Sequence, residues 1–543
     1  MHFKVKAIGG YKYLYLIENK WIDGRVKQVR QICVGRPEKV YRLLTGEGEL
    51  KVKSYDFGKA AALLHASEKM GLISAIERNV PKKHLEGLTI GEYVLLLIIG
   101  RSNGSLSRSQ IAGWFRRSGL QFIWEPHYSL SSQNCLNQMK RLDDLAIERI
   151  EEDIARNLIS QGLLPTRLIF DTTNEFTYIN DGESLPRKGA SKAKRYDKNL
   201  VGLGLAVNDA NLPFLSEVYP GNEHDSKIFV QIFDGICERL EKLKVRIEDI
   251  TLVFDKGINS QRNIDSVLER MHLIGSLTRA QVKSLFRVPQ DQYHDLYVNG
   301  KGHKITGFRG ERSVFGQSFT VVVSYNPSTH RLQQRTYERQ KARILAGIED
   351  LKRRCARKGR GRKPSVKGVM NAIVDLIPRQ IRGVFDYSVS ETDEGVEISF
   401  GVKKKAEDEL YRSFGKVAIF TDLHEWSDEE IVRAYNSKWQ IEEDFKWLND
   451  KVIMPLKPFW VRLDLTLRAH VFLCVMGLLL YRYLIWEIGD ESLTLPRLAA
   501  ILDRIRLAVV VRNGERPRVV VEEMGAEEVR IFNSLNLAGY IPR

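Results

Sequence analysis

Two aspartates in the chain follow short apolar stretches and could together hold a divalent metal ion. Asp171 ends the segment LPTRLIFD, and Asp255 ends the segment ITLVFD. Short apolar runs bounded by polar residues are typical of buried strands. Carboxylates at the ends of adjacent strands repel each other unless a hard divalent cation neutralises them. The pair therefore favours a metal site at the edge of a sheet, although either aspartate alone could cap a turn.

A third acid is predicted on the helix that contains AYNSKWQIEEDF. At about 100° per residue, Tyr435, Lys438 and Glu442 fall on one stripe of that helix. Glu442 is therefore the candidate third ligand. The alternative is an exposed acidic face that Glu442 shares with Glu443 and Asp444.

The elements around the aspartates are predicted in the order β-β-β-α-β-α-β over residues 163–280. The helix that follows Asp225 carries apolar residues at helical spacing, so one of its faces should be buried. A later helix is expected to start at Ser427, because Ser427 and Glu430 have the spacing of a capping box. These patterns predict an α/β fold.

The remaining regions differ in character and suggest six parts. We expect a small β unit at 1–50, with a turn at Asp23-Gly24, and a helical, DNA-binding region at 51–160. The first part of the core is expected at 161–284, a β-rich basic insertion at 285–415, the second part of the core at 416–490 and a C-terminal region at 491–543. Residues 90–117 are similar to a helix-turn-helix that would offer Arg116 and Arg117 to phosphates; an ordinary helical hairpin is the favoured alternative.

The charge balance favours a polyanionic partner. The 543 residues include 84 Lys and Arg against 68 Asp and Glu, a formal net charge of +16. Eight basic residues gather in KRRCARKGRGRK, at 352–363. This segment is either a solvated tract or a DNA-contacting loop. The DNA reading assigns phosphate contacts to Arg353, Arg354, Arg357, Lys358, Arg360 and Arg362.

Other features indicate a soluble protein of a reducing cytosol. The five cysteines are far apart and form no CxxC pair, and the N-terminal residues carry no secretory signal. The longest apolar run, Val471 to Tyr481, is too short for a membrane span and is expected to be a core helix. No Walker A motif is present, so no nucleotide cofactor is expected.

Three segments, LIFDTTNEF, TLVFDKGINSQRN and AYNSKWQIEEDF, resemble the acidic blocks of DDE transposases. The match is to bacterial insertion-sequence enzymes of the IS-four type and their close relatives, which have an RNase H-like core. Their signature is Tyr, two residues, Arg, three residues, Glu, six residues, Lys. Tyr435, Lys438 and Glu442 keep this spacing with Lys in place of Arg, and Asn449 occupies the last position.

This resemblance implies an RNase H-like α/β core with a β-rich insertion, preceded by the β unit and the helical domain. It implies that Asp171, Asp255 and Glu442 are catalytic and hold two Mg²⁺ ions, for which Mn²⁺ can substitute. Tyr435 and Lys438 would hold phosphates near the scissile bond. Lys446, one turn from Glu442, would replace the missing lysine; a plain Glu442–Lys446 surface pair has equal weight.

The implied activity is cleavage of transposon ends followed by strand transfer. The partners would be double-stranded DNA, as inverted-repeat ends and as target, and a second protomer in a synaptic complex. A prokaryotic cytoplasmic location, on the nucleoid when DNA is bound, is expected. Two alternatives remain: an RNase H-like nuclease without strand transfer, and a non-catalytic DNA-binding protein derived from a transposase.

Overall fold

The structure is a computed structural model that describes residues 1–543 except 23, 46–49, 82–86, 125–129, 181–182, 358–364, 393–394, 513–515 and 543. The chain divides into two compact units. The first contains Met1–Arg141, Lys451–Met454 and Leu480–Arg543, and the second contains Leu142–Asp450 and Pro455–Leu479. The turn expected at Asp23 lies outside the described residues.

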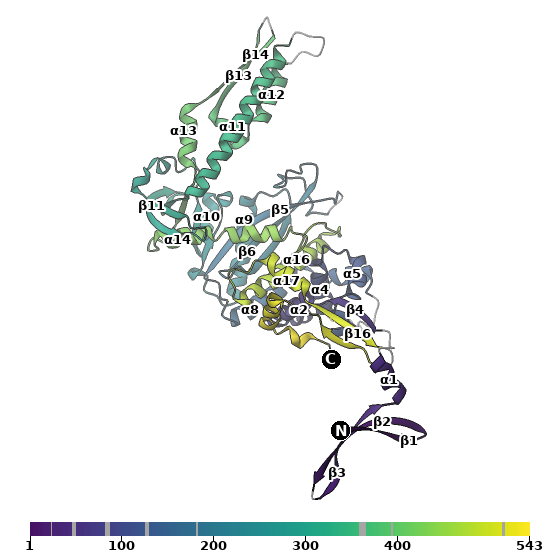
Figure 1. The fold of residues 1–543 in the computed structure, drawn as a ribbon. Helices are drawn as coiled ribbons and strands as arrows, with labels where there is room; N and C mark the ends of the chain where they lie inside the picture. Colours follow the sequence, from purple (N-terminus) through teal and green to yellow (C-terminus); the bar gives the residue numbers. More distant parts are fainter. Residues whose placement is uncertain are drawn as a thin grey trace. The chain divides into compact units, whose positions relative to one another are not determined.

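A mixed sheet forms the framework of the second unit (Figure 1). Counted over the described residues, it has nine strands in the order β10-β11-β12-β15-β9-β8-β5-β6-β7. Only β5, β8 and β9 are parallel neighbours. The strands are β5 (Arg167–Thr177), β6 (Asn199–Val207), β7 (Pro213–Pro220), β8 (Thr251–Val253), β9 (His272–Ser276), β10 (His294–Val298), β11 (Lys304–Val314), β12 (Gln317–Tyr325) and β15 (Lys416–Thr421).

The expected order β-β-β-α-β-α-β is confirmed. It consists of β5, β6 and β7, then α9 (Asp225–Lys242), β8, α10 (Gln261–Leu268) and β9. The apolar face of α9 packs on the sheet, with Phe229, Phe233 and Leu240 almost completely buried in its core. The α/β class of the core is therefore confirmed.

Asp171 lies within a strand and not at its end, contrary to the sequence-based expectation. β8 pairs with β5 only from Arg167 to Ile169, whereas β6 pairs with β5 as far as Thr177. The pairing with β6 carries the strand past the aspartate. Beyond Ile169, one edge of β5 has no partner strand among the described residues, and Asp171 lies at the beginning of this open edge.

The insertion is shorter than expected, because its first strands belong to the main sheet. β10, β11 and β12 continue that sheet through β15, so the expected start at residue 285 is wrong. A separate apolar core that includes Tyr337, Ile373 and Phe414 begins only after β12. The insertion comprises α11 (Pro327–Cys355), α12 (Val366–Leu376), β13 (Phe385–Thr392), β14 (Gly395–Val402) and α13 (Lys404–Ser413), with α11 and α12 side by side in Figure 1.

The helix expected to start at Ser427 is broken into two. α14 (Asp428–Asn436) and α15 (Trp439–Trp447) are separated by a turn at Ser437 and Lys438. The capping box between Ser427 and Glu430 is confirmed at the start of α14. α8 (Asp144–Ser160) and the beginning of α16 (Asp464–Ile488) complete the second unit.

The apolar helix α16 is, by length and composition, long enough to cross a membrane. However, 72% of its most apolar part is buried inside the protein. This is the pattern of a core helix, as expected for the run Val471 to Tyr481.

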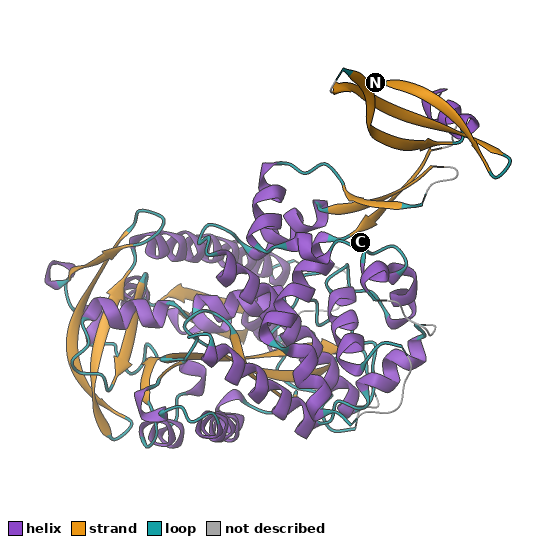
Figure 2. Cartoon of the chain, turned by 90° about the horizontal axis from the view of Figure 1, so that it is seen from below, coloured by secondary structure: helices purple, strands orange, loops and turns teal. Residues whose placement is uncertain are grey.

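The first unit joins the two ends of the chain. β4 (Leu50–Asp56) pairs with β16 (Arg506–Arg512), so the expected helical and C-terminal regions share one unit. β16 also pairs with β17 (Arg518–Val521). A separate sheet of β1 (His2–Ile8), β2 (Tyr11–Ile22) and β3 (Arg25–Gly35) is visible beside the N-terminus in Figure 2. The helices are α1 (Pro37–Thr45), α2 (Gly58–Met70), α3 (Leu72–Asn79), α4 (Ile90–Arg101), α5 (Arg108–Phe115), α6 (Leu120–Ile123), α7 (Ser132–Met139), the end of α16, α17 (Leu495–Arg504) and α18 (Ala526–Ser534).

Short 3₁₀ helices connect several elements of both units. They are η1 (Ile247–Asp249), η2 (Lys256–Ile258), η3 (Leu285–Arg287), η4 (Gln290–Gln292), η5 (Arg379–Val384) and η6 (Leu537–Tyr540).

Candidate active site

Side chains from three elements converge on Asp255, which follows β8 at the start of η2. The Tyr435 hydroxyl of α14 donates to Asp255 Oδ1 over 3.3 Å, and the Ser276 hydroxyl at the end of β9 donates to the same atom over 3.4 Å. Lys438 Nζ lies 3.6 Å from Asp255 Oδ1. The predicted neighbours Tyr435 and Lys438 thus meet the predicted aspartate, and Ser276 joins them from the adjacent strand.

Lys438 also pairs with the third predicted acid. Its Nζ lies 2.9 Å from Glu442 Oε1, one helical turn further on. The Lys438 side chain is only 13% exposed, whereas that of Glu442 is 58% exposed. One largely buried ammonium therefore links two carboxylates, and the exposed Glu442 can leave this pair for solvent or for another cation.

The turn between α14 and α15 places Lys438 at this position. The Lys438 N–H donates to the Tyr435 carbonyl over 3.1 Å, a spacing tighter than that of a regular α-helix. Because of this tightening, Tyr435 and Lys438 both reach Asp255 while Glu442 follows on the next turn.

The protein stabilises the ionised form of Asp171 less well than that of Asp255. Burial raises the pKa of its carboxyl above the usual value; Lys192, the Thr172 N–H and Lys438 oppose this rise, and Asp255 adds to it. The Thr172 N–H donates to Asp171 Oδ1 over 2.8 Å. An ionised Asp171 is thus incompletely compensated by the protein.

Asp255 and its neighbours show the opposite balance. Burial opposes ionisation of Asp255, but Lys438 and the Lys256 N–H outweigh it and hold the carboxyl pKa below its usual range. Burial raises the pKa of Tyr435 to about 12, so its hydroxyl remains a donor at neutral pH. The pKa of Lys438 is also raised, because Glu442, Tyr435 and Asp255 outweigh its burial.

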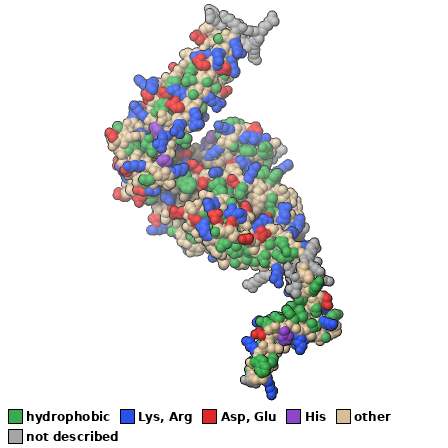
Figure 3. Space-filling model, in the orientation of Figure 1, with side chains coloured by type: hydrophobic (Ala, Val, Ile, Leu, Met, Phe, Trp, Pro, Cys, Tyr) green, Lys and Arg blue, Asp and Glu red, His purple; other side chains and the backbone are tan. Residues whose placement is uncertain are grey.

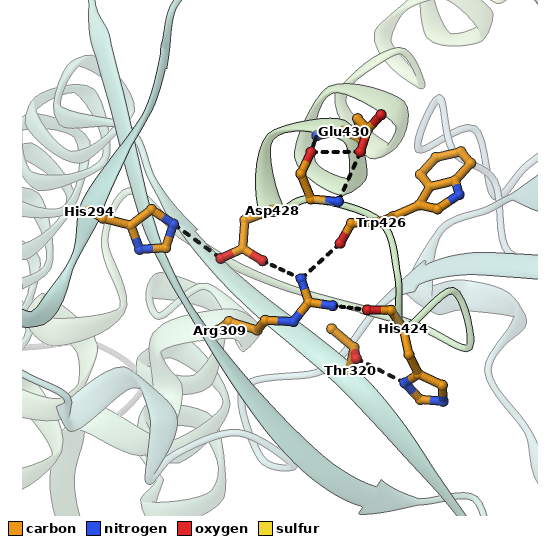
Figure 4. Close-up of polar contacts among 8 residues, drawn as sticks. His294, Arg309, Thr320, His424, Trp426, Asp428 and Glu430 are labelled. Atoms are coloured by element: carbon orange, nitrogen blue, oxygen red, sulfur yellow. Dashed lines mark hydrogen bonds and ion pairs between the residues drawn. The ribbon is translucent and has the colours of Figure 1, made fainter.

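A polar network anchors the start of α14 to the sheet (Figure 4). Arg309 of β11 donates to Asp428 Oδ1 and to the Trp426 carbonyl, both over 2.8 Å, and also to the His424 carbonyl. His294 of β10 pairs with the other Asp428 oxygen at 3.1 Å. Because α14 carries Tyr435, this network helps to set the position of the residues around Asp255.

The residue at the family's lysine position contacts a different acid. Asn449 Nδ2 donates to Glu175 Oε1 over 2.6 Å, and Lys457 Nζ pairs with Glu175 Oε2 at 2.7 Å. Asn449 therefore helps to hold a buried ion pair on β5.

The alternative pairing of Glu442 with Lys446 is not found among the described residues. Glu442 pairs with Lys438, and no ion pair joins Glu442 to Lys446 in the part of the chain that the structure describes. Lys446 is exposed and its Nζ lies 4.4 Å from the centre of the Trp447 ring. Its phosphate contact remains a prediction.

The other predicted DNA contacts lie on other elements. Arg116 and Arg117 are exposed residues of the first unit, directly after α5. Arg353 and Arg354 are exposed at the end of α11, where both pair with Asp350. Arg357 is exposed beyond α11, while Lys358, Arg360 and Arg362 lie outside the described residues.

Sequence reasoning missed Lys192, whose charge acts on Asp171. Lys192 Nζ donates to the Thr172 carbonyl, and its backbone N–H donates to Asn174 Oδ1 over 3.0 Å. The surrounding segment RKGASKAKRYDK is rich in cations, a signal that resembled an ordinary solvated loop. Arg309 was missed as well, because no local pattern connects residue 309 with a helix that starts at 428.

The donor set suits a hard divalent cation in part. Asp171 and Asp255 supply carboxylate oxygens, the ligands that Mg²⁺ prefers, and a bound cation would offset the burial that raises the pKa of Asp171. Across the described ranges, no group of three or more His, Cys, Asp or Glu side chains stands close enough to hold a metal ion. Glu442 can join the aspartates only by leaving Lys438.

Comparison with known proteins identifies one family model that covers most of this site. A family model described as "Transposase DDE domain" matches residues 177–453, just over half of the chain. The range includes Asp255 and Glu442, and Asp171 lies just before it. No curated protein matches the chain.

Six chains of known structure match. One is the "Mos1 transposase paired-end complex with left transposon end", with 13% sequence identity over 36% of this chain. The match spans 61% of that chain, and the TM-score of 0.15 is too low to inform the fold.

The opposite environments of the two aspartates predict opposite effects on stability. Without divalent metal at pH 8, Asp171→Asn should raise the melting temperature and Asp255→Asn should lower it, each by about 2–4 °C for roughly 1 kcal/mol. The first variant removes an incompletely compensated charge, and the second leaves Lys438 with one partner fewer. Adding Mg²⁺ should raise the melting temperature of the unaltered chain by more than it raises that of the Asp171→Asn variant. The exposed Asp295→Asn is the control, and equal shifts in all three variants would contradict the assignment.

The anchoring network predicts a second stability effect. Arg309→Ala should lower the unfolding free energy by about 2 kcal/mol, because it leaves one oxygen of the buried Asp428 carboxylate and two carbonyls without the Arg309 donor, while His294 keeps the other oxygen. Arg312→Ala, on the same strand, is the matched control, since Arg312 donates to the Ser284 hydroxyl. Urea unfolding measures both. A loss no larger for Arg309→Ala than for Arg312→Ala would show that the network does not stabilise α14.

Proposed function

The chain belongs to the transposase DDE domain family, and we propose that it cleaves DNA at the ends of a transposable element and joins those ends to target DNA. The observation that carries this proposal is the convergence of Asp255, Lys438 and Glu442 beside Asp171. These residues combine acids suited to a metal with a cation suited to a phosphate.

We assign the metal-holding role to the three acids. Asp171, Asp255 and Glu442 would hold Mg²⁺, two ions by family resemblance; Mg²⁺ bound there would activate the attacking water or 3′-hydroxyl and stabilise the leaving oxygen. The family match supports this role in general terms. The half-buried position of Asp171 adds support, because bound cations relieve uncompensated carboxylates.

Lys438 and Tyr435 would position the scissile phosphate. Lys438 is held as a full cation by two carboxylates and is ready to exchange one of them, Glu442, for a phosphate oxygen. Tyr435 keeps its proton at neutral pH and can donate to a second oxygen. Water attack breaks one phosphodiester and frees a 3′-hydroxyl, which then attacks target DNA, so no nucleotide triphosphate is needed.

The insertion is the proposed contact surface for end DNA. Lys and Arg side chains lie along the α11–α13 region, interspersed with acidic ones (blue and red in the upper part of Figure 3). Arg353, Arg354 and Arg357 extend this surface at the end of α11. Two protomers would pair two ends in the synaptic complex.

The test of the catalytic role uses labelled end DNA, a target plasmid and Mg²⁺. Asp171→Asn, Asp255→Asn and Glu442→Gln should each lower end cleavage by more than about 100-fold while end binding stays within twofold, because the acids and not the basic surface are altered. Glu443→Gln is the matched control and should cleave normally. Near-normal Mg²⁺-dependent cleavage by any of the three variants would remove that residue from the site.

The same assay separates the alternatives. Joined products support transposition, cut products without joining support a nuclease, and a bound complex without chemistry supports a non-catalytic DNA-binding protein.

The basic end of α11 makes a prediction about salt dependence. Replacing Arg353, Arg354 and Arg357 by Gln should flatten the slope of log affinity against log salt by about 0.9 for each phosphate that the variant no longer neutralises. The exposed Arg246, which pairs with Asp249 in the same unit, is the control. A slope equal to that of Arg246→Gln would show that these arginines are only solvated.

A further inference from the structure

The open edge of β5 is followed by cations that the catalytic assignment does not use. β8 ends its pairing at Ile169, and beyond that point Ala190 and Lys192 are hydrogen-bonded to Asn174 of β5. We define the β5 strip as Lys192, Arg195, Lys198 and Lys457 together with Tyr178 and Tyr196. All six residues belong to the second unit.

The strip begins at the catalytic aspartate. Lys192 donates to the Thr172 carbonyl, next to Asp171, and its charge lowers the pKa of that carboxyl. Asn174 holds the segment in place: it accepts from the Lys192 N–H over 3.0 Å and donates to the Ala190 carbonyl over 2.9 Å. Lys192 is therefore a fixed cation at the site.

Two further cations lie on one aromatic ring. Lys457 Nζ is 4.4 Å from the centre of the Phe176 ring, and the Arg195 guanidinium is 5.0 Å from it. Glu175 orients Lys457 at 2.7 Å, and Asp197 orients Arg195 at 2.9 Å. These cations are held on the strand and do not extend freely into solvent.

The far end of the strip adds exposed aromatic rings. Tyr178, directly after β5, is 64% exposed, and Tyr196 is 68% exposed. Lys198 Nζ lies 4.8 Å from the centre of the Tyr178 ring. The rings of Tyr178 and Tyr196 leave apolar surface in contact with water. A partner that stacks on these rings would bury that surface.

The chemistry of the strip fits one strand of DNA with unpaired bases. Cations that follow a backbone, combined with aromatic side chains on which bases stack, are typical of single-strand binding. A duplex offers phosphates to cations but no free base faces to tyrosines. From Thr172 to Tyr178 the strand rises by about 20 Å, enough for several nucleotides.

We propose that the β5 strip binds an unpaired DNA strand where it leaves the catalytic site, with phosphates on the four cations and bases on Tyr178 and Tyr196. The strip carries four cations against the two acids that orient them, so a net positive charge remains for phosphates. This inference rests on the proposed function, because it gives the strand adjacent to the scissile phosphate a place on the protein.

The test measures binding of the full chain to a labelled single-stranded 12-mer and to a duplex of unrelated sequence. The double variant Tyr178→Ala/Tyr196→Ala should bind the single strand about tenfold more weakly or worse, because base–aromatic stacking is lost. Duplex affinity should stay within twofold. A 2-aminopurine base in the 12-mer should be quenched on binding to the unaltered chain and not to the variant.

Two controls separate stacking from misfolding. Tyr178→Phe/Tyr196→Phe keeps both rings and should retain single-strand affinity. Tyr41→Ala removes an exposed tyrosine of the first unit and should change neither affinity. Unchanged single-strand binding by the double alanine variant, an equal loss for duplex and single strand, or no single-strand binding by the unaltered chain would each overturn the proposal.

The outcome is independent of cleavage. Selective loss of single-strand binding by the double variant, in a chain that cleaves no end DNA, would support the strip and contradict the proposed function. Normal single-strand binding by that variant, in a chain that does cleave, would contradict the strip alone.

Discussion

The burial of two carboxylates just beyond the paired residues of neighbouring strands is the constraint on which this site depends. Asp171 lies within β5 and Asp255 follows the parallel neighbour β8; both are partly buried, so water screens their charges only in part. Lys438 offsets the burial of Asp255 by pairing with it and with Glu442. Asp171 receives less compensation, and its raised pKa records the difference.

The surrounding fold brings these groups to one place and keeps them there. The short strand β8 ends at Val253, so Asp255 lies just beyond its carboxyl end. Beyond Ile169, β5 is no longer paired with β8. Helix α15 contacts β5, and α14 contacts the neighbouring strands β9, β12 and β15. Arg309 and His294 reach from β11 and β10 to the first turn of α14, so strands that extend the sheet also anchor the helix that carries Tyr435. The insertion has its own apolar core and can change without repacking these strands.

Cations reach the site from two segments that are distant in sequence. Lys438 approaches from the helices, and Lys192 approaches from the segment between β5 and β6. Asn449 and Lys457 both contact Glu175. Asn449 stands at the last position of the signature described above, where the resemblance predicts lysine, and its amide donates to this buried acid. At this position the side chain therefore contacts Glu175 and not Asp171, Asp255 or Glu442 among the contacts of the described residues.

The sequence by itself determined the α/β order, the two apolar strands that lead to aspartates, the capping box at Ser427, and the grouping of Tyr435, Lys438 and Glu442. These features depend on local periodicity and on spacing within one helix, which the chain encodes directly. Tertiary structure decided the rest. β6 extended β5 past Asp171, and a turn after Asn436 broke the helix. Lys192 and Arg309 acquired their contacts from segments distant in sequence, because hydrogen bonds and charge interactions across a fold leave no local pattern.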